Sequence, residues 1–216
     1  MMEFDAQAWV KVAAFVGGGI AMGLGAIGAA IGEGYTASLA NLAVSRNPKL
    51  SGDIFKNMLV GQAVAESASI FALVVAILLL FMNTGNASLI KAAALLGAGL
   101  SMGFGAIGSG VGSGFPGGQA CLGISRQPAT ISRLTTNMLI GSAVCQTPAI
   151  FAMVVALILL FMQVDPAAVT PAWAAMIGAG FSTGLAAIGS GYGGGMAAGA
   201  SCEGVARQPD TTTSVT

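Results

Sequence analysis

AIGAAIGEGY, at residues 26–35, recurs as AIGSGVGSGF at residues 106–115 and as AIGSGYGGGM at residues 187–196. The three copies begin 80 and then 81 residues apart. Two further segments follow the same spacing: SRNP at residues 45–48 returns as SRQP and ARQP, and FALVVA at residues 71–76 returns as FAMVVA. A fixed period of this kind indicates one structural unit that is repeated along the chain.

The composition indicates the environment of this unit. Hydrophobic residues make up 55% of the chain and charged residues 7%, proportions that a soluble globular protein cannot accommodate. Largely uncharged stretches lie at residues 12–44, 58–82, 89–124, 134–162 and 172–202. Each has at least the roughly 20 residues that a membrane-spanning helix needs, and strand-like alternation is absent from the sequence. The sequence therefore predicts an integral membrane protein with helical spans.

Each repeat holds two spans and is expected to be a helical hairpin. The predicted fold is an all-α membrane protein of tandem transmembrane hairpins: hairpin 1 at residues 10–82, hairpin 2 at residues 89–162, and the first helix and turn of an incomplete hairpin 3 at residues 171–216. Five spans are visible and a sixth is missing, so we expect a truncated sequence or, alternatively, a chain that ends on the cytoplasmic side. Units of two spans enter the membrane in one orientation, which suits a rotational ring.

The two helices of a hairpin differ in composition. The first is dense in small residues that let helix backbones approach closely, as in membrane helix dimers: Gly19, Gly23, Gly28 and Gly32, then Gly105, Gly108 and Gly112. The second is rich in leucine, isoleucine, valine and phenylalanine, as at residues 70–81, which favours an outer, lipid-facing position. Cys121, Cys145 and Cys202 show no pairing or metal-ligand spacing, so we expect them to be small buried residues.

Basic residues gather at the connections after spans one, three and five. Positively charged connections face the cytoplasm, so the N-terminus is predicted to lie outside a bacterial or archaeal cell membrane. The N-terminus MMEFD is acidic where a signal peptide would be basic, and no cleavable signal is expected. Proline follows each first helix and should end it, because the residue before proline is biased away from helical geometry.

Two carboxylates, Glu33 and Glu66, lie inside apolar stretches. Ionisable groups in hydrocarbon are costly and usually functional. The midpoint between them falls in the predicted turn, after Lys49, so both should lie at one membrane depth and can share one site. Glu33 is 13 residues before Arg46, a helical distance of about 20 Å, which places the pair well within the bilayer.

The second repeat carries no charge at these positions. Ser113 and Gln146 replace the two carboxylates, so this hairpin should not carry a translocated ion. Gln146 is expected to preserve a polar contact, and Pro148 is expected to kink or locally unwind its helix. The third repeat has Gly194 at the first position, and the sequence stops before the second.

The chain resembles the rotor-ring c subunits, or proteolipids, of F-type and V-type ATP synthases. Three elements carry this resemblance: the glycine-rich first helix, the RNP or RQP turn, and an acidic residue in the second helix. This resemblance implies hairpins that assemble into a ring, whose carboxylates bind and release H⁺ or Na⁺ as they pass a stationary a subunit. It also implies that the polar turns face the central stalk: Arg46, Asn47 and Pro48; Arg126, Gln127 and Pro128; Arg207, Gln208 and Pro209.

Within this resemblance, Glu66 matches the ion-carrying carboxylate. The segment Val64-Ala65-Glu66-Ser67 is similar to the Na⁺-binding form of the motif, which implies the Val64 carbonyl and the Ser67 hydroxyl as further ligands. Glu33 stands where the Na⁺ form usually has glutamine, and a carboxylate there resembles a two-carboxylate variant in which Glu33 would keep a proton. Ligands in such rings come from neighbouring hairpins, which adds the Val144 carbonyl and the Thr147 hydroxyl as candidates. The family's tyrosine on the second helix is replaced by Phe71.

A proton needs one carboxylate, whereas a hard cation needs several oxygens, so this donor set favours Na⁺ over H⁺. The implied partners are other c subunits in a homo- or hetero-oligomeric ring, the a subunit, stalk subunits and lipid, without nucleic acid or an organic cofactor. No phosphate-binding Gly-x-x-x-x-Gly-Lys loop occurs, so the chain should not hydrolyse ATP itself.

The alternative functions are a structural spacer that sets ring size and a secondary transporter or channel unrelated to ATP. If the chain carries one ion-binding carboxylate for two or three hairpins, fewer ions move per rotation, which favours building a large gradient by ATP hydrolysis. Near the last turn, Glu203 lies four residues before Arg207, and the two are expected to form an ion pair rather than an ion site.

Overall fold

Five long helices make up the computed structural model, which describes residues 5–85, 87–163, 165 and 170–211. They are α1 (Ala6–Arg46), α2 (Ser51–Phe81), α3 (Leu89–Arg126), α4 (Ile131–Phe161) and α5 (Ala172–Arg207). Each is long and apolar enough to cross a membrane. The predicted all-α membrane fold is therefore confirmed over this part of the chain. The acidic start of the sequence at residues 1–4 and the end of hairpin 3 at residues 212–216 lie outside the described residues.

A proline turn follows each glycine-rich helix, as the sequence predicts. Short 3-10 helices begin at these prolines: Pro48–Leu50, Pro128–Thr130 and Pro209–Thr211. Asn47, which precedes the first proline, has φ −142° and ψ 80°, and its N–H still donates to the Ala43 carbonyl at 3.0 Å. The helices α1, α3 and α5 thus continue past their apolar stretches, because the chain stays helical through the polar residues until the proline excludes that geometry.

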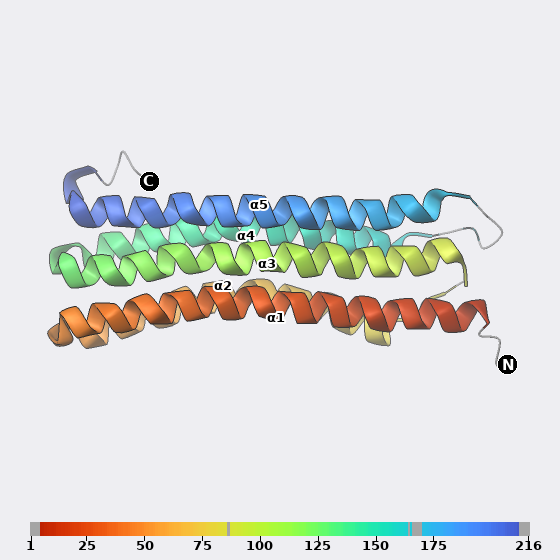
Figure 1. Cartoon of the computed structure of the whole chain (residues 1–216), viewed down its shortest axis with the longest axis horizontal. Coiled ribbons are helices and arrows are strands. Elements are labelled where there is room, and N and C mark those ends of the chain that lie inside the picture. Colours follow the sequence, from red (N-terminus) through yellow and green to blue (C-terminus); the bar gives the residue numbers. More distant parts are fainter. Residues whose placement is uncertain (1–4, 86, 164, 166–169, 212–216) are drawn as a thin grey trace.

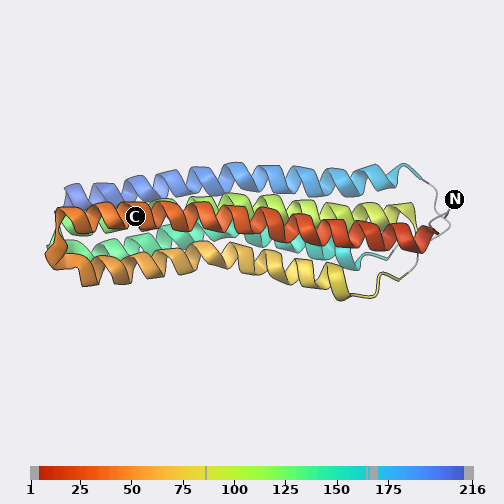
Figure 2. The same ribbon diagram turned by 60° about the horizontal axis from the view of Figure 1, so that its bottom comes forward.

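The helices form two layers. In Figure 1, α1, α3 and α5 lie side by side, while α2 and α4 lie behind the grooves between them. The turned view in Figure 2 shows the same arrangement, with α3 between α1 and α5. The proline turns lie at one end of the bundle and the N-terminal end of α1 lies at the other. Successive hairpins are therefore parallel copies of one another.

Glycines set the spacing within the first layer. A Cβ atom added at Gly110 of α3 would lie 2.6 Å from the backbone carbon of Gly28 of α1. On the opposite face of α3, added Cβ atoms at Gly108 and Gly112 would meet the backbone of α5 near Ile188 and Gly191. Only residues without a side chain permit backbones this close, so the glycine spacing does determine how these helices pack.

Pro148 lies inside α4 without interrupting it, so the local unwinding expected from the sequence does not occur. The helix is continuous over Ile131–Phe161. Two hydroxyl groups of α3 bond to the backbone on the C-terminal side of the proline: Ser109 Oγ accepts a hydrogen bond from the Ala149 N–H at 3.0 Å, and Ser101 Oγ donates to the Ala152 carbonyl at 2.9 Å. These bonds join α4 to α3 beside the proline, but neither reaches the Val144 carbonyl, whose helical donor the proline removes.

Candidate ion-binding site

The two carboxylates of hairpin 1 lie on the paired helices α1 and α2. Glu33 is half-buried and Glu66 is exposed. The hairpin packs these two helices against each other. Within the described residues, the Glu66 carboxylate forms no hydrogen bond or ion pair, and its backbone carbonyl accepts a bond from Ser69 Oγ at 2.8 Å. Glu66 is thus a carboxylate in an apolar helix whose charge the chain itself does not neutralise.

Two neutral oxygens lie close to each other beside Glu66. Ser67 Oγ donates to the Val64 carbonyl oxygen at 2.6 Å, so the two oxygens that the sequence proposes as further ligands are adjacent. Because the hydroxyl proton points to that carbonyl, the lone pairs of Ser67 Oγ remain free to accept a proton or coordinate a cation. On the facing helix, the Glu33 backbone carbonyl accepts a bond from Gln62 Nε2 at 3.4 Å.

Hairpin 2 presents a different set of groups at the corresponding positions. Gln146 is only 8% exposed, and its Nε2 donates at 2.8 Å both to Ser113 Oγ and to the Val64 carbonyl of hairpin 1. Ser113 Oγ in turn donates to the Ser109 carbonyl at 2.8 Å. The amide therefore links the two hairpins by a fixed neutral contact, and the same Val64 carbonyl serves both Ser67 and Gln146.

The other amide atom of Gln146 adds an acceptor to this region. Gln146 Oε1 is buried and receives no hydrogen bond from the part of the chain that the structure describes. Since both Nε2 bonds fix the orientation of the amide, Oε1 cannot exchange places with Nε2 without losing them. Hairpin 2 therefore offers an oxygen without an ionisable proton, in keeping with the expectation of a non-carrying hairpin.

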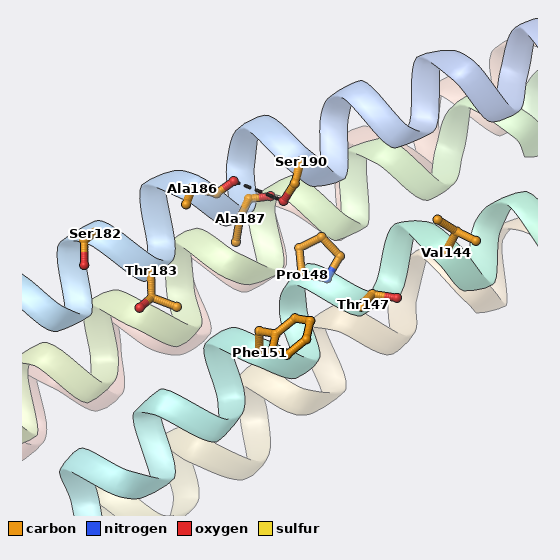
Figure 3. A pocket seen from close by; sticks show the side chains of 9 residues that line it. All are labelled: Val144, Thr147, Pro148, Phe151, Ser182, Thr183, Ala186, Ala187 and Ser190. Carbon is orange, nitrogen blue, oxygen red and sulfur yellow. Dashed lines mark hydrogen bonds between the residues drawn. The ribbon is translucent and has the colours of Figure 1, made fainter.

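Val144 and Thr147, the candidate ligands from hairpin 2, lie elsewhere. Together with Pro148 and Phe151 they line a cavity of about 660 Å³ between α4 and α5, and Figure 3 shows Pro148 facing Ser190 of α5 across it. Pro148 has no N–H, so the Val144 carbonyl lacks its usual helical donor. The cavity lies on the opposite side of α4 from the bond between Gln146 and hairpin 1.

The predicted ligands therefore separate into two places. The structure brings Glu66, Ser67, Val64 and Glu33 together in hairpin 1. Val144 and Thr147 lie instead at the cavity beside α5. Within one chain, hairpin 2 does not complete the site of hairpin 1 through these two residues.

The turn residues form a separate polar end. Arg126 and Arg207, at the ends of α3 and α5, both pair with Glu203, which lies 3.8 Å from Arg126. The expected pair between Glu203 and Arg207 is thereby confirmed, and the second pair joins two helices. Arg133 also donates to the Pro209 carbonyl at 2.9 Å.

Sequence reasoning missed the bond between Gln146 and the Val64 carbonyl. It predicted a polar contact for Gln146 but not its partner, since the two residues are 82 positions apart and on different hairpins. The repeat spacing alone could not show which neighbour the amide faces, because that depends on how the hairpins pack.

Comparisons with known proteins match the repeated segments of this chain. The sequence pattern of the ATP synthase c-subunit family matches residues 16–79, 96–159 and 177–216. A protein from Natranaerobius thermophilus that is named as the c subunit of ATP synthase is 48% identical over 79 residues, which are 37% of this chain and 91% of that protein. A protein from Alkaliphilus oremlandii with the same name is 45% identical over 34% of this chain and 83% of that protein. Another with this name, from Dehalococcoides mccartyi, is 54% identical over 29% of this chain and 83% of that protein.

Proposed function

The chain belongs to the family of ATP synthase c subunits, and we propose that it forms part of an ion-driven rotor ring in which Glu66 carries the translocated ion. Membership makes it a non-catalytic membrane subunit of the synthase. The observation that carries the proposal for Glu66 is the contrast between the two complete hairpins. At equivalent positions, Glu66 is exposed and its carboxylate has no bonded partner among the described residues, while Gln146 is buried and bonded.

Glu66 can exchange an ion because its surroundings supply part of a ligand shell and leave the rest open. Its carboxylate contributes the charge and the Ser67 hydroxyl contributes a neutral oxygen, whereas both lone pairs of the Val64 carbonyl already accept hydrogen bonds, from Ser67 and Gln146. A cation bound there neutralises the carboxylate, so the loaded site can move through lipid at lower cost than the empty, charged site. Release then requires a passage to water or an opposing charge, which the stationary a subunit would supply.

Several oxygens around one charge favour Na⁺ as the carried ion, with H⁺ as the alternative. Glu33 adds a second carboxylate near the first. Two ionised carboxylates beside a single Na⁺ would leave an excess negative charge in a medium of low dielectric constant, so one of them keeps its proton. We assign that proton to Glu33, which then donates a hydrogen bond instead of competing for the ion.

Hairpin 2 acts as a spacer in this scheme. Gln146 has no proton to release; its bond to Ser113 joins the two helices of hairpin 2, and its bond to the Val64 carbonyl joins hairpin 2 to hairpin 1. Each chain therefore carries fewer ions per rotation than it has hairpins, which favours a complex that builds a steep gradient by hydrolysing ATP. The arginine turns at one end of the bundle provide the surface for the cytoplasmic stalk, with the N-terminus outside.

Carbodiimide labelling of purified rings tests this proposal, because carbodiimides react with protonated carboxyl groups. We expect an adduct at Glu66 at neutral pH that Na⁺ suppresses, whereas any adduct at Glu33, which keeps its proton when the ion is bound, should not depend on Na⁺. Glu33→Gln should keep the adduct at Glu66, while Glu66→Gln should abolish it. Glu203, which is paired with two arginines, is the control carboxylate that should stay unlabelled with or without Na⁺. Labelling that ignores Na⁺ would identify H⁺ as the carried ion, and a lack of labelling at Glu66 would disprove its role as carrier.

A further inference from the structure

Two oxygens from different hairpins converge on the amide nitrogen of Gln146. The Ser113 hydroxyl of α3 and the Val64 carbonyl of α2 each accept a hydrogen bond from Nε2, and both bonds are 2.8 Å long. Gln146 itself lies on α4 and is only 8% exposed. The cluster therefore lies at the boundary between hairpin 1 and hairpin 2, among three helices that pack against one another.

Both oxygens present lone pairs to this nitrogen. Ser113 Oγ donates its own proton to the Ser109 carbonyl at 2.8 Å, so only its lone pairs remain for Nε2. The Val64 carbonyl has no proton, and its second lone pair accepts a hydrogen bond from Ser67 Oγ at 2.6 Å. Oxygen lone pairs that converge on one point are also the surroundings that a hard cation requires.

The oxygen end of the same amide is not used. Gln146 Oε1 is buried and accepts no hydrogen bond from the described part of the chain. Buried polar atoms are nearly always paired, and each exception needs an explanation. Residue 146 is held through its nitrogen alone, which indicates that this boundary accommodates a group of positive polarity rather than an amide as such.

The repeat shows which group the amide replaces. Glu66 and Glu33 are the counterparts of Gln146 and Ser113, each 80 residues earlier. Glutamate has the shape of glutamine, with a second oxygen in place of Nε2. At residue 146, that oxygen would face the Ser113 and Val64 oxygens without a hydrogen atom between them, and the three would repel one another. A carboxylate at this boundary would therefore need a cation between itself and the two oxygens.

We propose that the Gln146 amide substitutes for a carboxylate together with its bound cation, so that the boundary between hairpins 1 and 2 is a permanently filled copy of the ion site. The inference rests on the proposed function of Glu66 and explains how hairpin 2 rotates without an ion. The amide has no net charge, so the boundary crosses lipid at low cost with nothing bound. Because Nε2 keeps both oxygens occupied, no ion enters there.

A purely structural role for the amide predicts a different response to glutamate. If Gln146 only holds two helices together, a glutamate in its place breaks the contact under all conditions. If the amide replaces a cation, Na⁺ restores the contact, because it binds the carboxylate and both oxygens at once. A proton restores only part of it, since one O–H group donates to only one of the two oxygens.

Transfer of the carboxylate from one hairpin to the other tests the substitution. The boundary lies within one chain, so the full-length protein in detergent can be used whether or not rings form. The double variant Glu66→Gln, Gln146→Glu should give a carbodiimide adduct at residue 146 at neutral pH and low Na⁺. That adduct should fall about tenfold once Na⁺ is about ten times its dissociation constant. Glu66→Gln alone should show no adduct that Na⁺ suppresses.

Thermal unfolding gives a measurement that does not depend on labelling. It is done in the Glu66→Gln background, so that Na⁺ binding at Glu66 does not contribute. Gln146→Glu should lower the midpoint without Na⁺, and added Na⁺ should raise it again. Gln146→Leu should lower the midpoint at every Na⁺ concentration. Adding Ser113→Ala to Gln146→Glu should weaken the Na⁺ response, whereas adding Ser132→Ala, at an exposed hydroxyl of α4, should not.

Three results would overturn the substitution. They are the lack of an adduct at residue 146, an adduct there that ignores Na⁺, and a Gln146→Glu midpoint that stays low at every Na⁺ concentration. None of them bears on Glu66 in the unmodified protein. The proposed function fails separately, if the unmodified protein shows no adduct at Glu66.

Discussion

At the scale of the residue, the difference between Glu66 and Gln146 is one of hydrogen-bonding capacity. An amide donates through Nε2, and Gln146 uses both protons, to Ser113 Oγ and to the Val64 carbonyl. An ionised carboxylate only accepts, so it could not make either bond. Glutamine at this position consequently fixes the contact between hairpins, whereas in the proposed function glutamate at the equivalent position binds an ion.

Gln146→Leu should lower the stability of the chain by about 1–2 kcal/mol, because it removes two bonds between helices within an apolar medium. Thermal unfolding in detergent measures the change. Gln62→Leu is the matched control, since Gln62 makes one longer bond, at 3.4 Å, and is only partly buried. Equal losses in both variants would show that the bonds of Gln146 contribute nothing particular.

At the scale of the element, the end of α4 depends on a lysine of α3. Lys91 is 8% exposed, and its Nζ donates to the carbonyls of Leu160 at 2.7 Å and Met162 at 3.4 Å. These carbonyls lie at the C-terminal end of a helix, where a positive charge is favourable. Lys11 is its repeat equivalent on α1 and is exposed.

Lys91→Ala should therefore fray the last turn of α4, with a loss of about 1.5–3 kcal/mol for the charge-assisted bonds. Hydrogen exchange at the amides of residues 158–162 should accelerate by at least about tenfold, the factor that 1.4 kcal/mol corresponds to. Lys11→Ala should change exchange at the end of α2 much less. Unchanged protection in α4 after the Lys91 substitution would contradict this account of the helix end.

At the scale of the whole molecule, the proposed function makes the unequal hairpins determine the ratio of ions to ATP. In hairpins 1 and 2, the carboxylate pair occurs once and the neutral pair once. The free energy of one ATP is divided among the ions moved, so fewer carriers per rotation allow a steeper gradient.

Gln146→Glu should lower the steepest Na⁺ gradient that the reconstituted complex reaches at a fixed ratio of ATP to ADP and phosphate. The variant adds a second carrier per chain, so each ion receives a smaller share of the same free energy. Accumulation of Na⁺ in sealed vesicles measures the gradient. Gln146→Asn, which adds no charge, should leave the limit unchanged. A steeper or equal limit in the Glu variant would contradict the assignment of hairpin 2 as a spacer.

Much of the fold could be predicted because its signals are local. Apolar length predicts the five helices, and each Arg-x-Pro turn predicts where a first-layer helix ends. The unwinding expected at Pro148 does not occur, and hydroxyl groups at Ser101 and Ser109, far away in the sequence, bond to the backbone on the C-terminal side of the proline.

In the candidate site, too, some positions follow from the local sequence and others depend on how the helices pack. Val64, Glu66 and Ser67 lie within one helical turn, so their proximity follows from the sequence alone. The approach of Glu33 to Glu66 needed only the hairpin. The places of Val144 and Thr147, by contrast, depend on which side of α4 faces which neighbour, and local sequence does not contain that information.

The amino-acid sequence by itself determined the membrane class, the parallel repeat and the single carboxylate pair, because apolar length, period and residue identity are properties of the chain read in order. Only the tertiary structure decided that Gln146 bonds to Val64 and that glycines of α3 lie against the backbones of α1 and α5. Those features arise from contacts between helices that are about 80 residues apart in the sequence. Which face of a helix meets its neighbour depends on where the two backbones approach most closely.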